Sequence, residues 1–135
     1  MTQMLDSIFD GSVYLLERSL DLRLARQNLI AANVANAETP GYRALDMNFQ
    51  EVLRDMADKL DASRSGHTAP SGAAPVRVRL TAADTGSLGN DNNTVGLERE
   101  LGKLSENGLM FKAQALFLSK KLALLRQAVA SSQEG

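Results

Sequence analysis

The sequence predicts a mainly α-helical protein in which the N- and C-terminal helices pair as an antiparallel, coiled-coil-like bundle, with a short middle helix and a flexible central loop. Two observations lead to this prediction. Apolar residues recur at helical spacing near both ends of the 135-residue chain, whereas the stretch between them is rich in glycine and proline. We expect one domain, divided into residues 1–62, 63–96 and 97–135.

The first helix is predicted over about residues 12–36 and carries apolar side chains on two faces. One row follows the helical period and comprises Val13, Leu16, Leu20, Leu24, Ala31 and Val34. A second row recurs every seventh residue on roughly the opposite side and comprises Leu15, Leu22 and Leu29. A single partner helix cannot cover both faces, so the pattern indicates two different partners.

The C-terminal helix shows a longer apolar pattern. Its seam alternates steps of four and three residues: Leu97, Leu101, Leu104, Gly108, Phe111, Ala115, Leu118, Leu122, Leu125 and Val129. A strict seven-residue period predicts left-handed supercoiling, and the helix would be roughly 50 Å long at 1.5 Å per residue. A second stripe lies about 180° away and comprises Met110, Phe117 and Leu124. This helix too has two apolar sides.

A shorter amphipathic helix is predicted from Phe49 to about Leu60. Asn48 and Glu51 form an N-cap pair of the capping-box kind. The apolar face of this helix comprises Phe49, Val52, Leu53, Met56 and Leu60.

The central stretch from residue 63 to residue 96 is predicted to be a flexible surface loop. It holds five of the ten glycines and two of the three prolines, and it has no aromatic residue. Such a segment cannot bury enough apolar surface to offset about 1–2 kcal/mol of backbone entropy per residue. Only residues 76–80 alternate in the manner of a short strand.

Composition and charge exclude several classes of function. The 15 basic and 16 acidic residues nearly cancel, so the chain lacks the positive field expected of a protein that binds nucleic acid or an anionic membrane. No run approaches the roughly 20 apolar residues of a membrane span, so we expect no direct membrane insertion. The first ten residues have neither the cationic segment nor the apolar stretch of a cleaved signal peptide.

No catalytic, metal-binding, cofactor-binding or small-molecule site is predicted. The chain has no cysteine, and its single histidine, His67, falls in the central loop without a second histidine to share a metal ion. Glu98, Glu100 and Glu106 are expected on the outer face of the C-terminal helix, where such charges form weak surface pairs. Four cations near the end of this helix are read as a solvated face: Lys112, Lys120, Lys121 and Arg126.

The most informative stretch runs from Ala31 to Arg43 and is typical of a helix end followed by a fixed turn. Its main residues are Asn33, Asn36, Thr39, Pro40, Gly41 and Tyr42. Asparagine is a poor interior helix residue that readily hydrogen-bonds free backbone carbonyls. The Pro-Gly pair predicts a type II turn, and the tyrosine is an aromatic anchor with one polar end. Each piece is common in helix caps, whereas the whole run is much rarer.

This run resembles the signature of the bacterial flagellar rod and hook proteins, in which Asn-x-x-Asn is followed by a Thr-x-Gly-aromatic-basic turn. The resemblance continues through residues 20–28 and 44–49 and returns at residues 92–100 and 118–126. The short length, the turn without insertion and the Leu-Ser-Lys-Lys-Leu segment are most similar to the FlgB family of proximal rod proteins. Gly96 departs from the pattern, because relatives tend to carry Asp or Asn there as the helix cap.

The resemblance implies a non-enzymatic structural subunit of the flagellar basal-body rod, the torque-transmitting shaft that crosses the periplasm. It also implies export from the cytoplasm through the flagellar type III apparatus. The implied partners are other copies of the chain, other flagellar rod proteins and the basal-body adaptor protein at the membrane ring. The terminal helices would supply an assembly seam formed by Leu15, Leu22, Leu29, Leu101, Leu104, Met110, Phe111, Phe117, Leu118, Leu122, Leu124 and Leu125.

Two alternatives remain at this point: a generic coiled-coil interaction protein without a flagellar role, and a small enzyme. The sequence leaves open which face of each helix is intramolecular. If the rod hypothesis holds, we expect charged substitutions at Leu22 or Phe117 to spare the folded hairpin and to abolish assembly and swimming.

Overall fold

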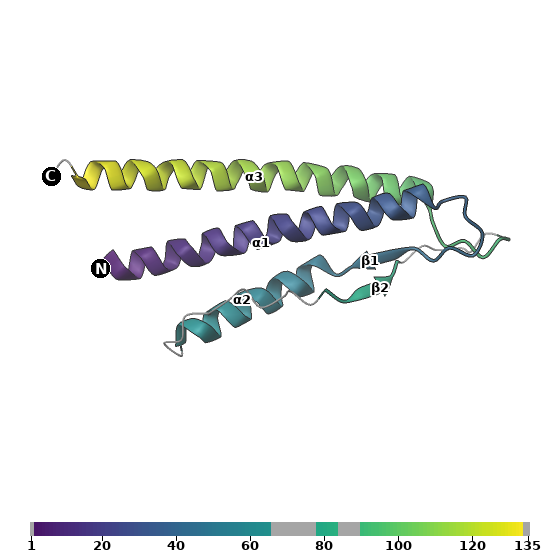
Figure 1. Cartoon of the computed structure of the whole chain (residues 1–135), viewed down its shortest axis with the longest axis horizontal. Coiled ribbons are helices and arrows are strands. Elements are labelled where there is room, and N and C mark those ends of the chain that lie inside the picture. Colours follow the sequence, from purple (N-terminus) through teal and green to yellow (C-terminus); the bar gives the residue numbers. More distant parts are fainter. Residues whose placement is uncertain (1, 66–77, 84–89, 134–135) are drawn as a thin grey trace.

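The computed structural model describes residues 2–65, 78–83 and 90–133 and shows an elongated, three-helix molecule (Figure 1). Its elements are α1 (Thr2–Ala35), β1 (Leu45–Met47), α2 (Phe49–Ser65), β2 (Leu80–Ala82) and α3 (Leu97–Gln133). The helix α3 runs antiparallel along α1, so that the N-terminal end of α1 and the C-terminal end of α3 lie together. The predicted fold class is confirmed.

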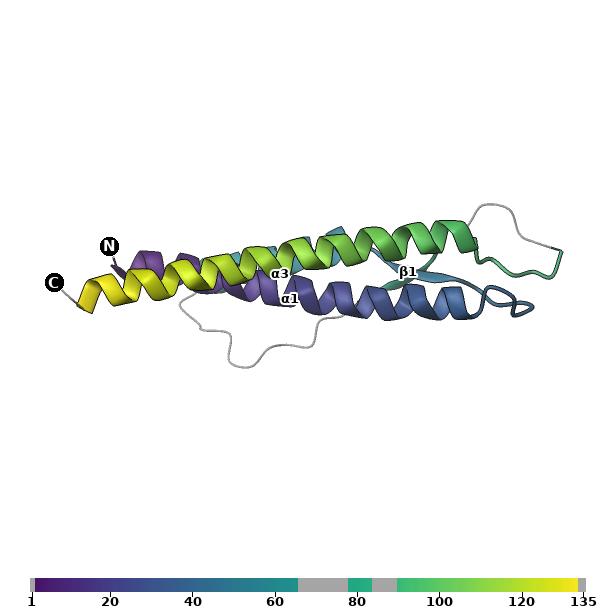
Figure 2. The same ribbon diagram turned by 90° about the horizontal axis from the view of Figure 1, so that it is seen from above.

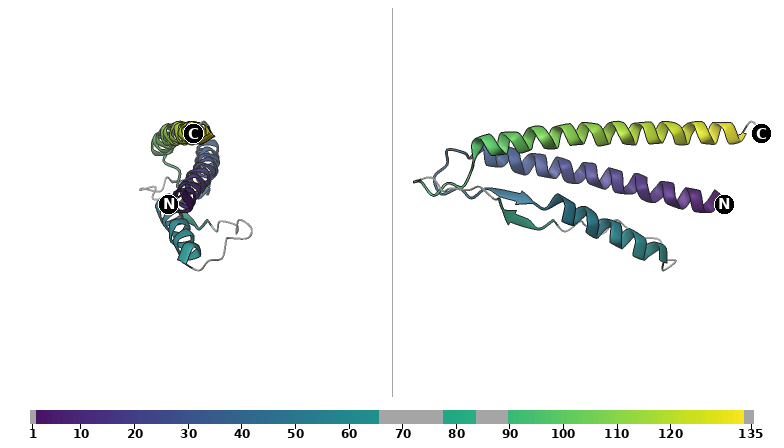
Figure 3. Two further views of the ribbon diagram at one scale, coloured as in Figure 1. Left: turned by 90° about the vertical axis from the view of Figure 1, so that its left-hand side faces the viewer. Right: turned by 180° about the vertical axis from the view of Figure 1, so that it is seen from behind.

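The helix α1 lies between α3 on one side and α2 on the other, as the end-on view shows (Figure 3, left). Seen from above, α3 crosses α1 at a shallow angle (Figure 2), and the two helices diverge toward the N- and C-terminal ends (Figure 1). Since α1 begins at Thr2, it is about ten residues longer than its sequence pattern predicted.

The middle helix begins where its cap predicts. The side-chain oxygen of Asn48 accepts a hydrogen bond from the backbone N–H of Glu51 at 3.3 Å, and its amide group donates to the Glu51 carboxylate at 3.1 Å. These bonds satisfy a backbone donor that the first helical turn leaves free. The helix continues to Ser65, beyond the predicted end.

The fold contains a two-stranded antiparallel sheet, whose strand β1 comes directly before α2 in the chain and whose strand β2 comes after it. Strand β1 pairs with β2 in the register Leu45↔Ala82 and Met47↔Leu80. The strand therefore lies slightly later in the chain than the alternating residues 76–80 suggested, and residues 76 and 77 lie outside the described residues. The predicted loop thus contributes β2 to the fold, and it also contributes residues 90–96, which pack at the tip of the molecule.

The apolar core lies between α1, β1 and α2, and it covers the second row of α1. Leu22 is buried with Met47, Val52 and Met56, and its cluster is completed by the partly buried Leu15, Phe49 and Val78. The expectation that a charge at Leu22 would spare the fold is therefore wrong. The apolar face of α2 packs against the row of Leu22 on α1. The second partner of α1 is therefore a helix of the same subunit.

Replacing Leu22 with Asp should unfold the subunit or lower its free energy of unfolding by about 3–5 kcal/mol, because the change buries a charge and removes a core side chain. Urea unfolding followed by circular dichroism measures this change. Leu116→Asp is the matched control, because Leu116 is 59% exposed and should shift the midpoint little. Equal stability of both variants would contradict the core described above.

Candidate assembly surface

The predicted turn forms the tip of the molecule. The backbone N–H of Tyr42 donates to the carbonyl of Thr39 at 3.2 Å, and Gly41 has a φ of 73°. Both features match the predicted type II turn, in which the third residue needs a positive φ. Asn36 closes the preceding helix by donating from its side-chain amide to the carbonyl of Ala32 at 2.8 Å. Thr39, Pro40 and Gly41 are exposed, and Tyr42 is half-buried.

Asn33 has a larger role than the helix cap that the sequence suggested. Its wholly buried amide group donates to the carbonyl of Leu45 and to the carboxylate of Glu100, each at 2.8 Å. Its oxygen accepts the N–H of Leu45 at 3.1 Å and the hydroxyl of Tyr42 at 3.4 Å. One side chain therefore joins α1, the turn, β1 and α3.

Asn93 is a functional residue of the tip that the sequence analysis missed. Its buried side-chain amide lies within hydrogen-bonding distance of the carbonyls of Asn36, Ala37 and Thr39, at 3.0, 2.9 and 2.8 Å. Two backbone bonds reinforce this contact, from Gly41 to the Asp91 carbonyl at 2.9 Å and from Thr94 to the Tyr42 carbonyl at 3.0 Å. The chain before α3 thereby holds the turn after α1. The Asn-Asn-Thr run at residues 92–94 was the sequence signal that could have identified Asn93.

A cluster of four charged side chains connects α1, β1 and α3 just below the tip. Arg26 forms two hydrogen bonds with Asp46, at 2.9 and 3.0 Å. Lys103 lies 3.1 Å from Asp46 and 2.8 Å from Glu100. Glu100 is wholly buried, so the expectation that it lies on the outer face of the helix is wrong. The helical period places Lys103 beside Glu100, but it did not show that Asn33 of α1 would meet it.

The ionisation of this cluster is tuned by burial and by its own hydrogen bonds. Burial disfavours the Asp46 carboxylate, but hydrogen bonds from Arg26, the Met47 N–H and Lys103 outweigh that effect and hold the pKa of Asp46 below its ordinary value. Burial likewise disfavours the Lys103 ammonium, but Glu100 and Asp46 raise the pKa of Lys103 above its ordinary value. The charged forms of both groups therefore stabilise the fold.

The predicted seam of α3 divides into two columns. One column is half-buried and comprises Leu104, Phe111, Leu118 and Leu125. That column begins at the exposed Leu97. The other column includes the exposed Leu101, Leu122 and Val129. A uniformly apolar seam would place the second column against α1. Instead, the polar residues Asn107 and Gln114 contact α1. The side of α1 that faces α3 carries Ser19 and Arg23, and these residues need polar partners.

The second stripe of α3 is uncovered in the single subunit. Met110, Phe117 and Leu124 are 43%, 59% and 66% exposed, and Leu109 and Leu116 beside them are also exposed. We call these five residues the outer apolar face. In the second row of α1, by contrast, Leu22 is buried and Leu15 and Leu29 are half-buried. The two terminal helices thus differ: the second row of α1 is largely covered within the subunit, and the second stripe of α3 is exposed.

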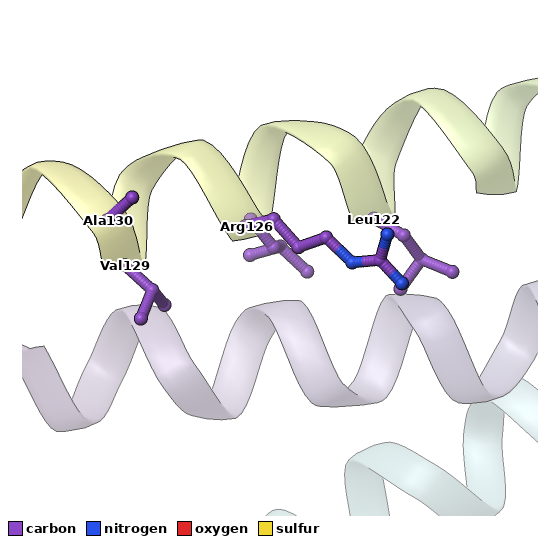
Figure 4. Close-up of a pocket in the computed structure, with 5 residues that line it drawn as sticks. Leu122, Arg126, Val129 and Ala130 are labelled. Atoms are coloured by element: carbon purple, nitrogen blue, oxygen red, sulfur yellow. The ribbon is translucent and has the colours of Figure 1, made fainter.

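Two grooves flank the contact between α1 and α3. One has a volume of 420 Å³ and is lined by Leu122, Leu125, Arg126, Val129 and Ala130, with Val129 pointing from α3 toward α1 (Figure 4). The other lies between α1 and α3, where the apolar Leu24 and Phe111 line it together with four polar residues: Arg23, Gln27, Asn107 and Lys112.

The described part of the chain contains no cluster of three or more His, Asp or Glu side chains that could hold a metal ion. None of its helices has an apolar stretch long enough to span a membrane. His67, which we expected to be a solvated loop residue, lies outside the described residues.

Known proteins resemble this chain over most of its length. A family model described as "Flagella basal body rod protein" matches residues 14–43, the segment that runs from within α1 to the end of the turn. The flagellar basal body rod protein FlgB of Salmonella typhimurium is 30% identical over 128 residues, which cover 88% of this chain and 92% of that protein. FlgB of Bacillus subtilis is 29% identical over 109 residues, which cover 79% of this chain and 84% of that protein.

The paired terminal helices, the fixed turn and these matches define a protein of the flagellar basal-body rod class. Within that class, the chain belongs to the FlgB family.

Replacing Gly41 with Ala should destabilise the fold by about 1 kcal/mol, because an L side chain is strained at a φ of 73°. No atom lies within 4 Å of the added methyl group, so the cost comes from the backbone alone. Gly102→Ala is the matched control: its site in α3 is equally open, and the change should stabilise the helix by about 0.5–1 kcal/mol. Urea unfolding of both variants tests this, and equal shifts of the same sign would contradict the turn.

Stability should fall at acid pH in a way that depends on Asp46. Because its pKa in the folded state is lowered, its stabilising contribution is complete above the ordinary value of 3.8 and is lost as the pH falls through the folded value. Urea midpoints measured across this range should therefore decrease more steeply for the wild type than for Asp46→Asn. Parallel curves for the two proteins would contradict the assignment.

Proposed function

We propose that this chain is a structural, non-enzymatic subunit of the flagellar basal-body rod and that it polymerises through the outer apolar face of α3. Two findings support the proposal: the relatives are flagellar basal body rod proteins, and the five residues of the outer apolar face of α3 are exposed. A generic coiled-coil protein would bury its apolar seam between its own two helices. Here the intramolecular contact includes buried polar residues and the apolar side faces outward.

The outer apolar face supplies the driving force for assembly in this proposal. Covering one Leu or Phe side chain contributes about 1.5–3 kcal/mol, so several such residues on one helix can hold neighbouring subunits together. Contacts between unlike faces of successive subunits generate a helical polymer when the rotation from one subunit to the next does not close into a ring. Long, parallel-packed helices along such a polymer suit a shaft that carries torque.

The wider setting of the subunit follows from the same proposal. Its neighbours would be other copies of the chain, other flagellar rod proteins and the basal-body adaptor protein at the membrane ring. It would reach the rod, across the periplasm, through the flagellar type III export apparatus. Residues 1–62, 63–96 and 97–135 would then form one domain, to which the central segment contributes β2 and the contacts of Asn93.

The proposal predicts that Phe117→Asp abolishes rod assembly and swimming but leaves the subunit folded. Phe117 is 59% exposed, so a charge there costs the isolated subunit little and prevents a neighbouring subunit from covering the face. Swimming of a deletion strain that carries the variant tests assembly, and circular dichroism of the purified chain tests folding.

Phe117→Leu is the matched control, because it keeps an apolar side chain at the same position and should preserve swimming. Normal swimming with Phe117→Asp would show that this face is not an assembly surface. Loss of folding in that variant would show that the face is already covered within the subunit.

A further inference from the structure

A series of polar pairs joins α1 to α3 along most of their contact. On α3 these residues recur every seventh position: Glu100, Asn107, Gln114 and Lys121. Their partners on α1 follow in the opposite direction along the chain: Asn33, Gln27 with Arg23, Ser19 and Ser12. We call this set the polar ladder. The proposed rod function assigns no role to these residues.

The two central steps of the ladder are built from side-chain amides. The amide group of Asn107 donates to the side-chain oxygen of Gln27 at 2.8 Å and to the carbonyl of Arg23 at 2.9 Å. The side-chain oxygen of Gln114 accepts from the Ser19 hydroxyl at 3.2 Å and from the Arg23 guanidinium at 2.9 Å. Each amide therefore has its partners at one alignment of the two helices.

The outer steps complete the alignment. Asn33 donates to Glu100 at 2.8 Å near the tip, and Lys121 donates to the hydroxyl of Ser12 toward the far end. Moving α3 by one heptad in either direction would separate Asn33 from Glu100. Since both side chains are wholly buried, such a slip would leave an amide and a carboxylate without these partners inside the protein.

The burial of the ladder makes misalignment costly. Four of its residues are among the buried polar side chains of the molecule: Ser19, Asn33, Glu100 and Asn107. Among the described residues, every buried side-chain nitrogen or oxygen atom has a hydrogen-bond partner. The native alignment thus satisfies the whole set at once.

Hydrophobic burial alone does not select this arrangement. The outer apolar face of α3 carries Phe117 and Leu124, and Leu24 of α1 is also exposed. Turning α3 about its axis would place more apolar surface against α1. A buried polar residue at a helix interface is a known means of fixing one register at some cost in stability.

We propose that the polar ladder sets the rotation and the register of α3 against α1, and that it thereby keeps the outer apolar face of α3 directed away from the subunit. Asn107 and Gln114 act as positioning residues in this device: they select one alignment rather than add stability. The proposal concerns pairing within one chain, so it stands or falls independently of the rod function.

The test replaces Asn107 and Gln114 together with Leu in the full-length chain. The chain has no cysteine, so cysteines at the exposed positions Glu17 and Ala113 carry two spin labels without interference. Double electron–electron resonance then measures the distance between the label on α1 and the label on α3. The Ser19 hydroxyl keeps its bond to the Leu16 carbonyl at 2.9 Å, so the variant leaves that group satisfied.

We expect one distance in the wild type and two or more in the variant, because a slip of one heptad moves the label at residue 113 by about 10 Å along the helix axis. The melting temperature of the variant should be unchanged or higher. Asn28→Leu with Gln127→Leu is the matched control, because it makes the same chemical changes at exposed positions and should keep the single distance.

A single, unchanged distance in the variant would overturn the proposal, because the turn would then be sufficient to fix the register. Unfolding of the double variant, and of Asn107→Leu and Gln114→Leu singly, would also overturn it, because the ladder would then be a source of stability rather than of alignment.

Discussion

The polar contact between α1 and α3 determines where the other surfaces of the molecule are found. Because Glu100 and Asn107 are buried against Asn33 and Gln27, the five residues of the outer apolar face of α3 cannot also face α1. They remain on the outside, where water alone covers them in the single subunit. Buried polar groups require their partners in a particular geometry, whereas apolar groups accept any apolar neighbour. Directional interactions therefore join α1 to α3, and the outer apolar face of α3 stays exposed.

The tip of the molecule is held by side chains from segments that are distant in sequence. Asn93 binds the carbonyls of the turn after α1, and Asn33 binds β1 and α3 at the same end. The charged cluster centred on Asp46 and Lys103 lies directly below. On the other side of α1, the small cluster around Leu22 and Met56 attaches α2. The helix α1 is thus the central element, and each of its sides has a different kind of partner.

This division of roles fits a subunit of the FlgB family. A protein that assembles through its helices needs a stable internal arrangement and an exposed surface that other subunits can cover. The covered row of α1 supplies the first requirement, and the outer apolar face of α3 supplies the second. The two helices have similar sequence patterns but different surroundings. Leu22 and Leu116 are equally apolar, and only Leu22 lies in the core.

The sequence by itself determined the three helices, the N-cap of α2 at Asn48, the turn at Pro40-Gly41 and the presence of two apolar sides on each terminal helix, because these features depend on spacing and local dihedral preferences. It also carried the family resemblance in the run from Asn33 to Arg43. Only the tertiary structure decided that the row of Leu22 is covered by α2, that Glu100 is buried, and that Asn93 holds the turn. The physical reason is that a helical period shows which side chains share a face, whereas the partner of that face depends on where distant segments of the chain return.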